Sequence, residues 1–257
     1  MTFRQQYIAF KTIVIKEILR FSRIWVQTLV PAVITTSLYF LIFGNLIGSQ
    51  LNAIDGYSYV DYIVPGIILM SVITNSYGNV VSSFYGHKFQ HHVEEMLVSP
   101  MPNIVLLSGF VVGGVARGIV VGSVVTIVAM FFTELHFQHI AITSFVVILT
   151  AILFSLAGFV NAVYANSFDD ISIIPTFVLT PLTYLGGIFF SIEMLNNFWQ
   201  NIALFNPILY MINAMRYGML GVSDINITTA FVIIILFTLA LLWFCLYLLK
   251  NGIGLRS

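Results

Sequence analysis

The sequence predicts an all-α integral membrane protein with six transmembrane helices. Charged residues make up 8% of the 257 residues, and the mean hydropathy is +1.00. A polar surface this small cannot cover a soluble domain of this length. The apolar residues also gather in long runs with almost no charge, each close to the roughly 20 residues that a helix needs to cross a bilayer. Because the bilayer core holds no water to satisfy backbone groups, we expect these runs to be helical.

Residues 1–25 are predicted to form an amphipathic helix that lies along the inner membrane surface. Apolar side chains recur there at alternating steps of four and three, at Phe3, Tyr7, Phe10, Val14, Ile18, Phe21 and Trp25. The basic residues lie largely on the other faces of this helix. The alternative interpretation is a basic topogenic leader with incidental helicity. Both interpretations place the amino terminus in the cytoplasm.

The six spans are expected at residues 26–47, 62–84, 104–132, 140–164, 171–190 and 228–249. Six crossings from an inner amino terminus return the carboxyl terminus to the cytoplasm. The spans take up nearly the whole chain, so we expect residues 1–257 to form a single membrane domain. The charges agree with this topology, because cytoplasmic segments are enriched in Lys and Arg. The basic residues of the inner segments are Arg4, Lys11, Lys16, Arg20, Arg23, Lys88, Lys250 and Arg256. In the outer segments only Arg216 opposes the rule, against Asp55, Asp61, Glu134, Glu193 and Asp224.

The fifth predicted span carries residues that break a helix, namely Pro175, Pro181, Gly186 and Gly187. Proline removes a backbone donor and clashes with the preceding turn, so we expect this span to bend, and the bend favours a hinge or gate there.

The outer segment at residues 191–227 is almost as apolar as a span, but it is interrupted at Asn206, Pro207 and Gly221. This combination is typical of short re-entrant helices that dip back into the bilayer, where surrounding protein shields the irregular backbone.

A polar segment at residues 86–102 separates the second and third spans. Its apolar residues Phe89, Val93, Met96 and Leu97 are spaced by four, three and one, while His91, His92, Glu94 and Glu95 take the other faces. The pattern predicts a short amphipathic helix, which Pro100 and Pro102 end. Because this helix is polar, cytoplasmic and isolated between apolar runs, we expect a partner outside the membrane to dock there.

His87, His91 and Glu95 also fall at steps of four, with His92 adjacent, so in principle they could bind zinc. No recognisable metal motif covers them, and a solvated or partner-facing surface is the favoured interpretation.

Arg117 is a charged residue inside the third span, about 18 Å along the helix from its start. Either it has an interior partner or a water-filled path, or the helix begins in the cytoplasm and leaves Arg117 near the inner surface. Gly114, Gly118 and Gly122 form a groove on the same helix, which favours close packing of another helix. That helix could belong to the same subunit or to a second copy in a dimer.

Several activities have no support in the sequence. The chain has no GxxxxGK[ST] phosphate loop, no HExxH motif and no serine nucleophile motif. No acidic residue lies in the middle of a span, where proton or sodium coupling would need one. A transporter with this sequence is therefore either a passive pore or takes its energy from another subunit.

Three segments together resemble the ABC-2 type permeases, the membrane subunits of certain ATP-binding cassette exporters. They are GHKFQHHVEEMLVSPMP at 86–102, FDDISIIPTFVLTPLTYLGGIFFSIEML at 168–195 and FNPILYMINAMRYGMLG at 205–221. The residues that carry the resemblance are Glu94, Leu97, Pro100, Pro181, Gly186, Asn206, Pro207 and Arg216.

The resemblance implies the ABC-2 exporter fold: an interface helix at 1–25, a coupling helix at 86–102 and a re-entrant region at 191–227. It also implies a dimer of permeases in a bacterial inner membrane, with two copies of a separate cytoplasmic ATPase. ATP and magnesium would bind to that ATPase, and this chain would bind no cofactor. The chain would contact membrane lipids and would not bind nucleic acid. The residues implied to contact the ATPase are Phe89, Glu94, Glu95, Leu97 and Pro100. The candidates for the path or gate are Arg117, Pro181, Gly186, Asn206, Pro207 and Arg216.

The substrate stays open at this point. Aromatic residues make up 15% of the chain, which favours an apolar or amphipathic cargo such as a lipid-like molecule or a hydrophobic drug. Glycan export is a further possibility, because aromatic rings also stack on sugars. The alternative to an ATP-driven exporter is an ATPase-independent channel or secondary carrier.

Overall fold

A computed structural model describes residues 1–50, 53–54 and 56–255, and over these ranges the protein is all-helical. The amino-terminal half contains α1 (Phe3–Arg23), α2 (Trp25–Tyr39), the π-helix η1 (Phe40–Ile47), the 3-10 turn η2 (Gly48–Gln50), α3 (Tyr59–Phe89), α4 (His92–Val98) and α5 (Asn103–Ala129). The remaining elements are α6 (Ile140–Tyr164), α7 (Asp170–Ile174), the π-helix η3 (Pro175–Leu179), α8 (Thr180–Tyr184), the 3-10 turn η4 (Ile192–Met194), α9 (Asn197–Leu204), α10 (Pro207–Leu220) and α11 (Ile227–Asn251). Asp55 and Arg256, two residues of the charge argument, lie outside the described residues.

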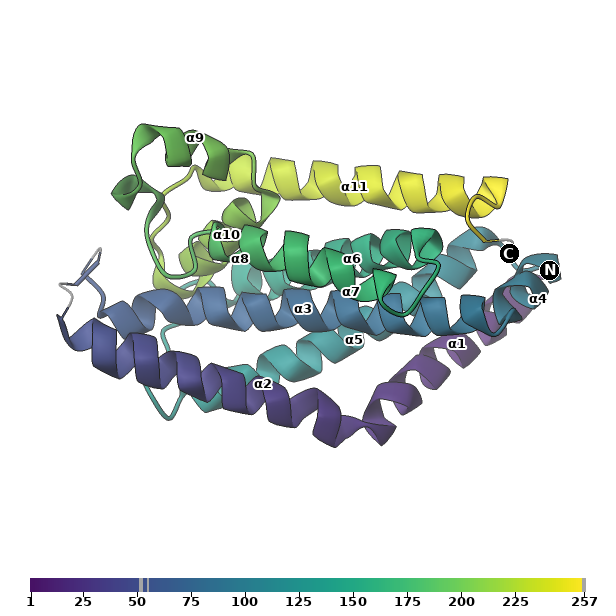
Figure 1. The fold of residues 1–257 in the computed structure, drawn as a ribbon, viewed down its shortest axis with the longest axis horizontal. Coiled ribbons are helices and arrows are strands. Elements are labelled where there is room, and N and C mark those ends of the chain that lie inside the picture. The colour runs from purple at the N-terminus through teal and green to yellow at the C-terminus, as the bar shows by residue number, and fades with distance from the viewer. Residues whose placement is uncertain (51–52, 55, 256–257) are drawn as a thin grey trace.

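Five helices in the described ranges are long and apolar enough to cross a membrane: Trp25–Gly44, Tyr59–Phe89, Asn103–Ala129, Ile140–Tyr164 and Ile227–Asn251. They correspond to the first, second, third, fourth and sixth predicted spans. Figure 1 shows them running side by side along the long axis of the molecule. Both termini and α4 lie at one end of this bundle, and α9 lies at the other.

The fifth predicted span, at 171–190, does not form one long helix. The chain is helical only from Asp170 to Tyr184, as α7, η3 and α8 in succession. Proline residues explain the interruption, because Pro175 and Pro181 cannot donate to the helical hydrogen-bond ladder. At Pro175 the ladder lengthens to a π-type bond, in which the Thr180 amide donates to the Pro175 carbonyl. Gly187, with a φ of 80°, then turns the chain away.

Capping residues explain where several of the other helices begin and end. The Ser58 side chain accepts from the Asp61 amide at the start of α3, and Asn226 accepts from two amides at the start of α11. Gly221 and Gly252 end α10 and α11 in the left-handed conformation that glycine adopts without strain.

The central helix of the bundle is α3, which packs along both α5 and α6. Glycine residues make these contacts close. A Cβ atom on Gly158 of α6 would lie 2.6 Å from the carbonyl oxygen of Tyr77, and one on Gly114 of α5 would lie 3.0 Å from that of Ser76. The backbones can approach to this extent only because neither glycine has a side chain.

Gly114, Gly118 and Gly122, which the sequence predicted to contact another helix, all face α3 of the same subunit. A Cβ atom at Gly118 would meet Ser76, and one at Gly122 would meet Val72. In this subunit the groove is therefore filled by α3.

Candidate functional site

The segment at 86–102 is not the single helix that the sequence predicted. α3 continues through Gly86 to Phe89, the chain breaks at Gln90 and His91, and a separate helix, α4, follows. His91 has a φ of 59°, in the left-handed region that ends a right-handed helix. Phe89 therefore belongs to the end of α3, and only Val93, Met96 and Leu97 of the predicted stripe lie on α4.

α4 is anchored to the bundle on one face and open on the other. Val93 is 1% exposed and holds the helix in place, with Met96 and Leu97 partly buried beside it. On the open face lie Glu94, Glu95 and Val98, and Pro100 just after α4 and Phe89 at the end of α3 are exposed as well. We call these five residues the end surface. Val98, 87% exposed, was missed by the sequence reasoning, although its spacing of three and four from Glu95 and Glu94 places it on their face of the helix.

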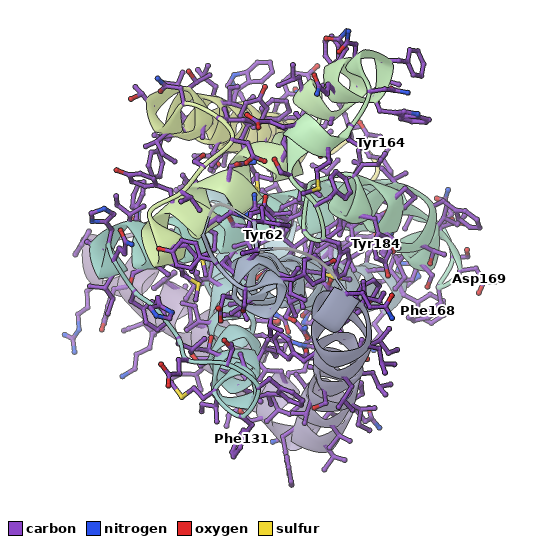
Figure 2. The ribbon with its side chains drawn as sticks, turned by 90° about the vertical axis from the view of Figure 1, so that its left-hand side faces the viewer. Tyr62, Phe131, Tyr164, Phe168, Asp169 and Tyr184 are labelled. Carbon is purple, nitrogen blue, oxygen red and sulfur yellow. The ribbon has the colours of Figure 1, made fainter. Side chains whose placement is uncertain are left out.

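The end of α3 is held by the connection between α6 and α7. The ammonium group of Lys88 donates to the carbonyls of Val163 and Ala165 at 2.6 and 2.7 Å, which satisfies the carboxyl end of α6. Phe168 packs against both Phe89 and Tyr85, with ring centroids 5.1 and 4.9 Å apart. Figure 2 shows Phe168 and its neighbour Asp169 together at one side of the molecule.

The predicted histidine face does not form. His87 lies on α3, where it contacts Lys16 and its Nδ1 donates to the Ser83 carbonyl at 2.8 Å. His91 lies at the break and its ring is 3.6 Å from the Glu94 carboxylate. The left-handed residue at position 91 rotates α4 away from the axis of α3, so a spacing of four no longer places side chains on one face. Among the residues that the structure describes, no group of three possible metal ligands meets.

A buried carboxylate that the sequence reasoning missed joins α1 to α3. Glu17 is 0% exposed; it accepts a hydrogen bond of 2.6 Å from Ser83 Oγ and lies 3.4 Å from Arg20. Arg20 in turn donates to both the backbone and side-chain oxygens of Asn79 at 2.8 Å. Next to Glu17, burial lowers the pKa of the Lys16 ammonium group.

The face of α1 that contacts the protein therefore differs from the predicted apolar stripe. Of that stripe only Phe21 is buried, while Phe3 and Tyr7 are 85% and 59% exposed. Ile13 and Glu17 pack instead against Gly109 and Gly113 of α5. The spacing of four in both pairs is the signal that could have found this contact.

At the opposite end of the bundle, Arg216 of α10 is fully buried in a polar cluster. Its Nη2 donates to the Gly187 carbonyl at 2.6 Å, and its Nη1 lies 3.7 Å from Oδ2 of Asp224. The guanidinium also stacks over the ring of Tyr62, 3.9 Å from the centroid. Figure 2, which looks along the bundle, shows Tyr62 near its centre. Arg216, the exception to the charge rule, is thus paired inside the protein.

The predicted residues at the start of α10 lie against α8. Asn206 caps this helix by accepting from the Ile208 amide at 3.0 Å, and it donates to the Leu182 carbonyl of α8 at 2.6 Å. Pro207 takes the first helical position, where the missing amide costs nothing. A Cβ atom at Gly186 would lie 2.9 Å from the Ile208 side chain. The segment at 182–187 thus contacts the start of α10 through Leu182 and Gly186 and contacts Arg216 through Gly187, and Pro181 lies on α8 just before this segment.

The region at 191–227 consists of η4, two short helices and their connections. α9 is an eight-residue helix with Phe198 and Trp199 65% and 45% exposed. α10 is buried almost throughout its 14 residues, but at about 21 Å it is too short to cross the roughly 30 Å hydrocarbon core.

Arg117 is the candidate that lies apart from both ends. It sits 14 residues after the start of α5, about 21 Å along the helix, and lines a cavity of about 280 Å³ between α2, α3 and α5.

Comparison with known proteins supports the resemblance that these segments carry. The sequence profile of the ABC-2 type transporter family matches residues 8–220. The chain is 54% identical over 251 residues to the inner membrane transport permease YadH of Escherichia coli K12, covering 98% of both proteins, and equally to YadH of Shigella flexneri. It is also 26% identical over 191 residues to nodulation protein J of Rhizobium leguminosarum bv. viciae, covering 74% of both. The chain belongs to the ABC-2 type transporter family of membrane permeases.

Proposed function

We propose that the chain is the membrane subunit of an ATP-binding cassette exporter of the bacterial inner membrane, and that a separate cytoplasmic ATPase drives it. The family membership supports the class of transporter. The observation that carries the coupling role is the end surface, where α4 presents Glu94, Glu95 and Val98 away from the bundle. It lies at the end of the molecule that also holds both termini.

Two mechanical connections support transmission from this surface. α4 follows α3 after a break of two residues, and α3 is the helix around which α5 and α6 pack. The Glu17 contacts join α1 to the same part of α3. A displacement of α4 or α1 would therefore be transmitted to α3, the central helix of the bundle.

In this proposal the broken segment from Asp170 to Tyr184, with the residues that follow it, makes the fifth of six crossings. Both termini are cytoplasmic, which agrees with the basic residues of α1. Two copies of the chain and two copies of the ATPase form the working assembly, and the cargo is amphipathic or hydrophobic.

Copurification tests the coupling role. The tagged full-length chain is coexpressed with the ATPase encoded by a neighbouring gene, and the ATPase recovered per permease is measured. The variant Glu94→Lys/Glu95→Lys is expected to recover much less ATPase, because it reverses two charges on the end surface. The matched control Glu134→Lys/Glu193→Lys reverses two exposed charges away from this surface and should recover the normal amount. Equal recovery from both variants would count against the end surface as the docking site.

A further inference from the structure

The cavity at Arg117 is separate from the end surface and from the Arg216 cluster. On α5, Gly109, Gly113 and Arg117 are spaced by four and share one face. Gly109 contacts Ile13 and Gly113 contacts Glu17, so α1 covers the first two positions. Arg117 lies one turn further along α5, where α2 and not α1 is the neighbouring helix. Its side chain lines the cavity between α2 and α3.

The charge of Arg117 has no counterion among the described residues. No hydrogen bond or ion pair of the described part of the chain reaches its guanidinium, and its Nε is buried without an acceptor. The charged group that acts on it electrostatically is Arg20, which is also basic and is already bonded to Glu17 and Asn79. An unpaired guanidinium at this depth in a membrane protein is costly. An anion from outside the chain would remove that cost.

The cavity has a polar end and an apolar end. α2 and α3 run in opposite directions along the bundle. Residues early in α2 therefore meet residues late in α3. Thr28 of α2 and Thr74 and Asn75 of α3 line the end nearer α1. Tyr39, Ile67 and Met70 line the other end, where the Tyr39 hydroxyl bonds to that of Tyr184 in α8 at 2.7 Å.

α2 forms one wall of this cavity. The outer face of α2 carries exposed apolar side chains, with Val30, Ile34 and Leu38 at 41%, 54% and 50% exposure, as expected for a helix against lipid. A molecule with an anionic head and an apolar chain fits this arrangement, with the head at Arg117 and the chain along Ile67 and Met70.

We propose that this cavity binds the anionic headgroup, a phosphate or a carboxylate, of a membrane amphiphile. Arg117 provides charge-assisted hydrogen bonds to the anionic oxygens, which are stronger than bonds between neutral groups. Thr28, Thr74 and Asn75 supply further polar contacts. Resting on the proposed export function, this assignment makes anionic amphiphiles the class of cargo.

Binding to the purified full-length chain tests the site without the ATPase. Native mass spectrometry in detergent measures the lipid retained after titration with phosphatidylglycerol, oleate, phosphatidylcholine or inorganic phosphate. The wild-type chain should retain phosphatidylglycerol or oleate in preference to phosphatidylcholine. Arg117→Gln should bind the anionic amphiphile about tenfold more weakly, the change expected from losing a charge-assisted hydrogen bond. Arg117→Lys keeps the charge and should restore most of the binding.

Two further variants guard against misfolding and non-specific attraction. Thr74→Leu leaves Arg117 in place but fills the polar end of the cavity, and it should also weaken binding. Arg23→Gln removes an exposed charge of α1, and it should leave tight binding unchanged. Equal affinity of the wild-type and Arg117→Gln chains for both anionic amphiphiles would overturn the proposal. So would retention of inorganic phosphate without either amphiphile.

The same variants separate this proposal from the proposed function. Arg117→Gln should copurify with the ATPase normally, because Arg117 lies away from the end surface. In the reconstituted complex, phosphatidylglycerol or oleate should stimulate ATP hydrolysis by the wild type and not by Arg117→Gln. If no ATPase copurifies with any variant, the proposed function fails while the binding measurement still decides the site.

Discussion

Ser83 of α3 donates a hydrogen bond of 2.6 Å from its hydroxyl to Oε1 of Glu17, which lies on α1. Both residues are buried, Glu17 at 0% and Ser83 at 3% exposure. The bond fixes the amino-terminal helix to α3 only six residues before α3 ends at Phe89. The amino-terminal helix is therefore joined inside the protein to the part of α3 that leads into α4.

Replacing Glu17 should separate these helices. Glu17→Ala removes the acceptor for Ser83 and the partner of Arg20, and we expect it to lower the free energy of unfolding by about 2 kcal/mol. Glu17→Gln keeps an acceptor oxygen for Ser83 and should cost less. Unfolding of the purified chain in mixed micelles with increasing dodecyl sulfate measures both values. An alanine variant as stable as the glutamine variant would show that the bond contributes little.

The contact of α6 with α3 gives a second prediction. A Cβ atom on Gly158 would lie 2.6 Å from the Tyr77 carbonyl oxygen, a backbone atom that cannot rotate away. Gly158→Ala should therefore force the helices apart and destabilise the protein by about 1–3 kcal/mol.

Gly78 of α3 is a matched control, because apart from the backbone of its own helix turn no heavy atom lies within 4 Å of a Cβ placed there. Gly78→Ala should be neutral or stabilise the helix by about 0.5–1 kcal/mol, since alanine is the better helix former. The same unfolding assay applies to both variants. Similar losses at both positions would mean that the close approach of α6 to Tyr77 is not what the glycine provides.

Hydropathy alone located most of the long helices, because a bilayer requires apolar residues over a fixed length. It did not show that the fifth predicted span, at 171–190, would be divided into the shorter helical elements α7, η3 and α8. The proline positions predicted a bend. The length of the run could not show that the helix would end at Tyr184.

The contacts between helices were harder to predict from the sequence than the helices themselves. Glu17 is a single acid among basic residues, and its partners Asn79 and Ser83 lie on a helix distant in the sequence. The end of α3 at Phe89 depends on the left-handed backbone of His91, for which the sequence carries no glycine signal. By contrast, Asn206 and Pro207 form a local pattern, a cap followed by proline at the first helical position, and their role at the start of α10 is visible in the sequence.

The Asn206 cap gives a third prediction. Asn206 is 3% exposed and bonds both the Ile208 amide and the Leu182 carbonyl. Asn206→Ala should cost about 2 kcal/mol, since it removes a cap and leaves a buried carbonyl without its donor. Asn196 caps the exposed helix α9 through the Trp199 amide, and Asn196→Ala should cost about 1 kcal/mol or less. Thermal unfolding of both variants in detergent provides the comparison, and an equal loss of stability would contradict it.

The buried pair of Arg216 and Asp224 gives the fourth prediction. Their side chains are 1% and 5% exposed, and Nη1 and Oδ2 are 3.7 Å apart. Arg216→Leu leaves the carboxylate buried without its cation and should destabilise the protein by about 3–5 kcal/mol. In Arg216→Leu/Asp224→Asn the buried charge is gone, while the asparagine can still accept from the Ile192 amide. The stability loss of the double variant should therefore be smaller than the sum of the losses of the two single variants, Arg216→Leu and Asp224→Asn, by more than about 1 kcal/mol. A full double-mutant cycle in the dodecyl sulfate assay measures this coupling, and Arg23→Leu, at an exposed arginine, is the control for loss of a positive charge. Losses that add to within about 0.5 kcal/mol would show that the two residues stabilise the Arg216 cluster independently.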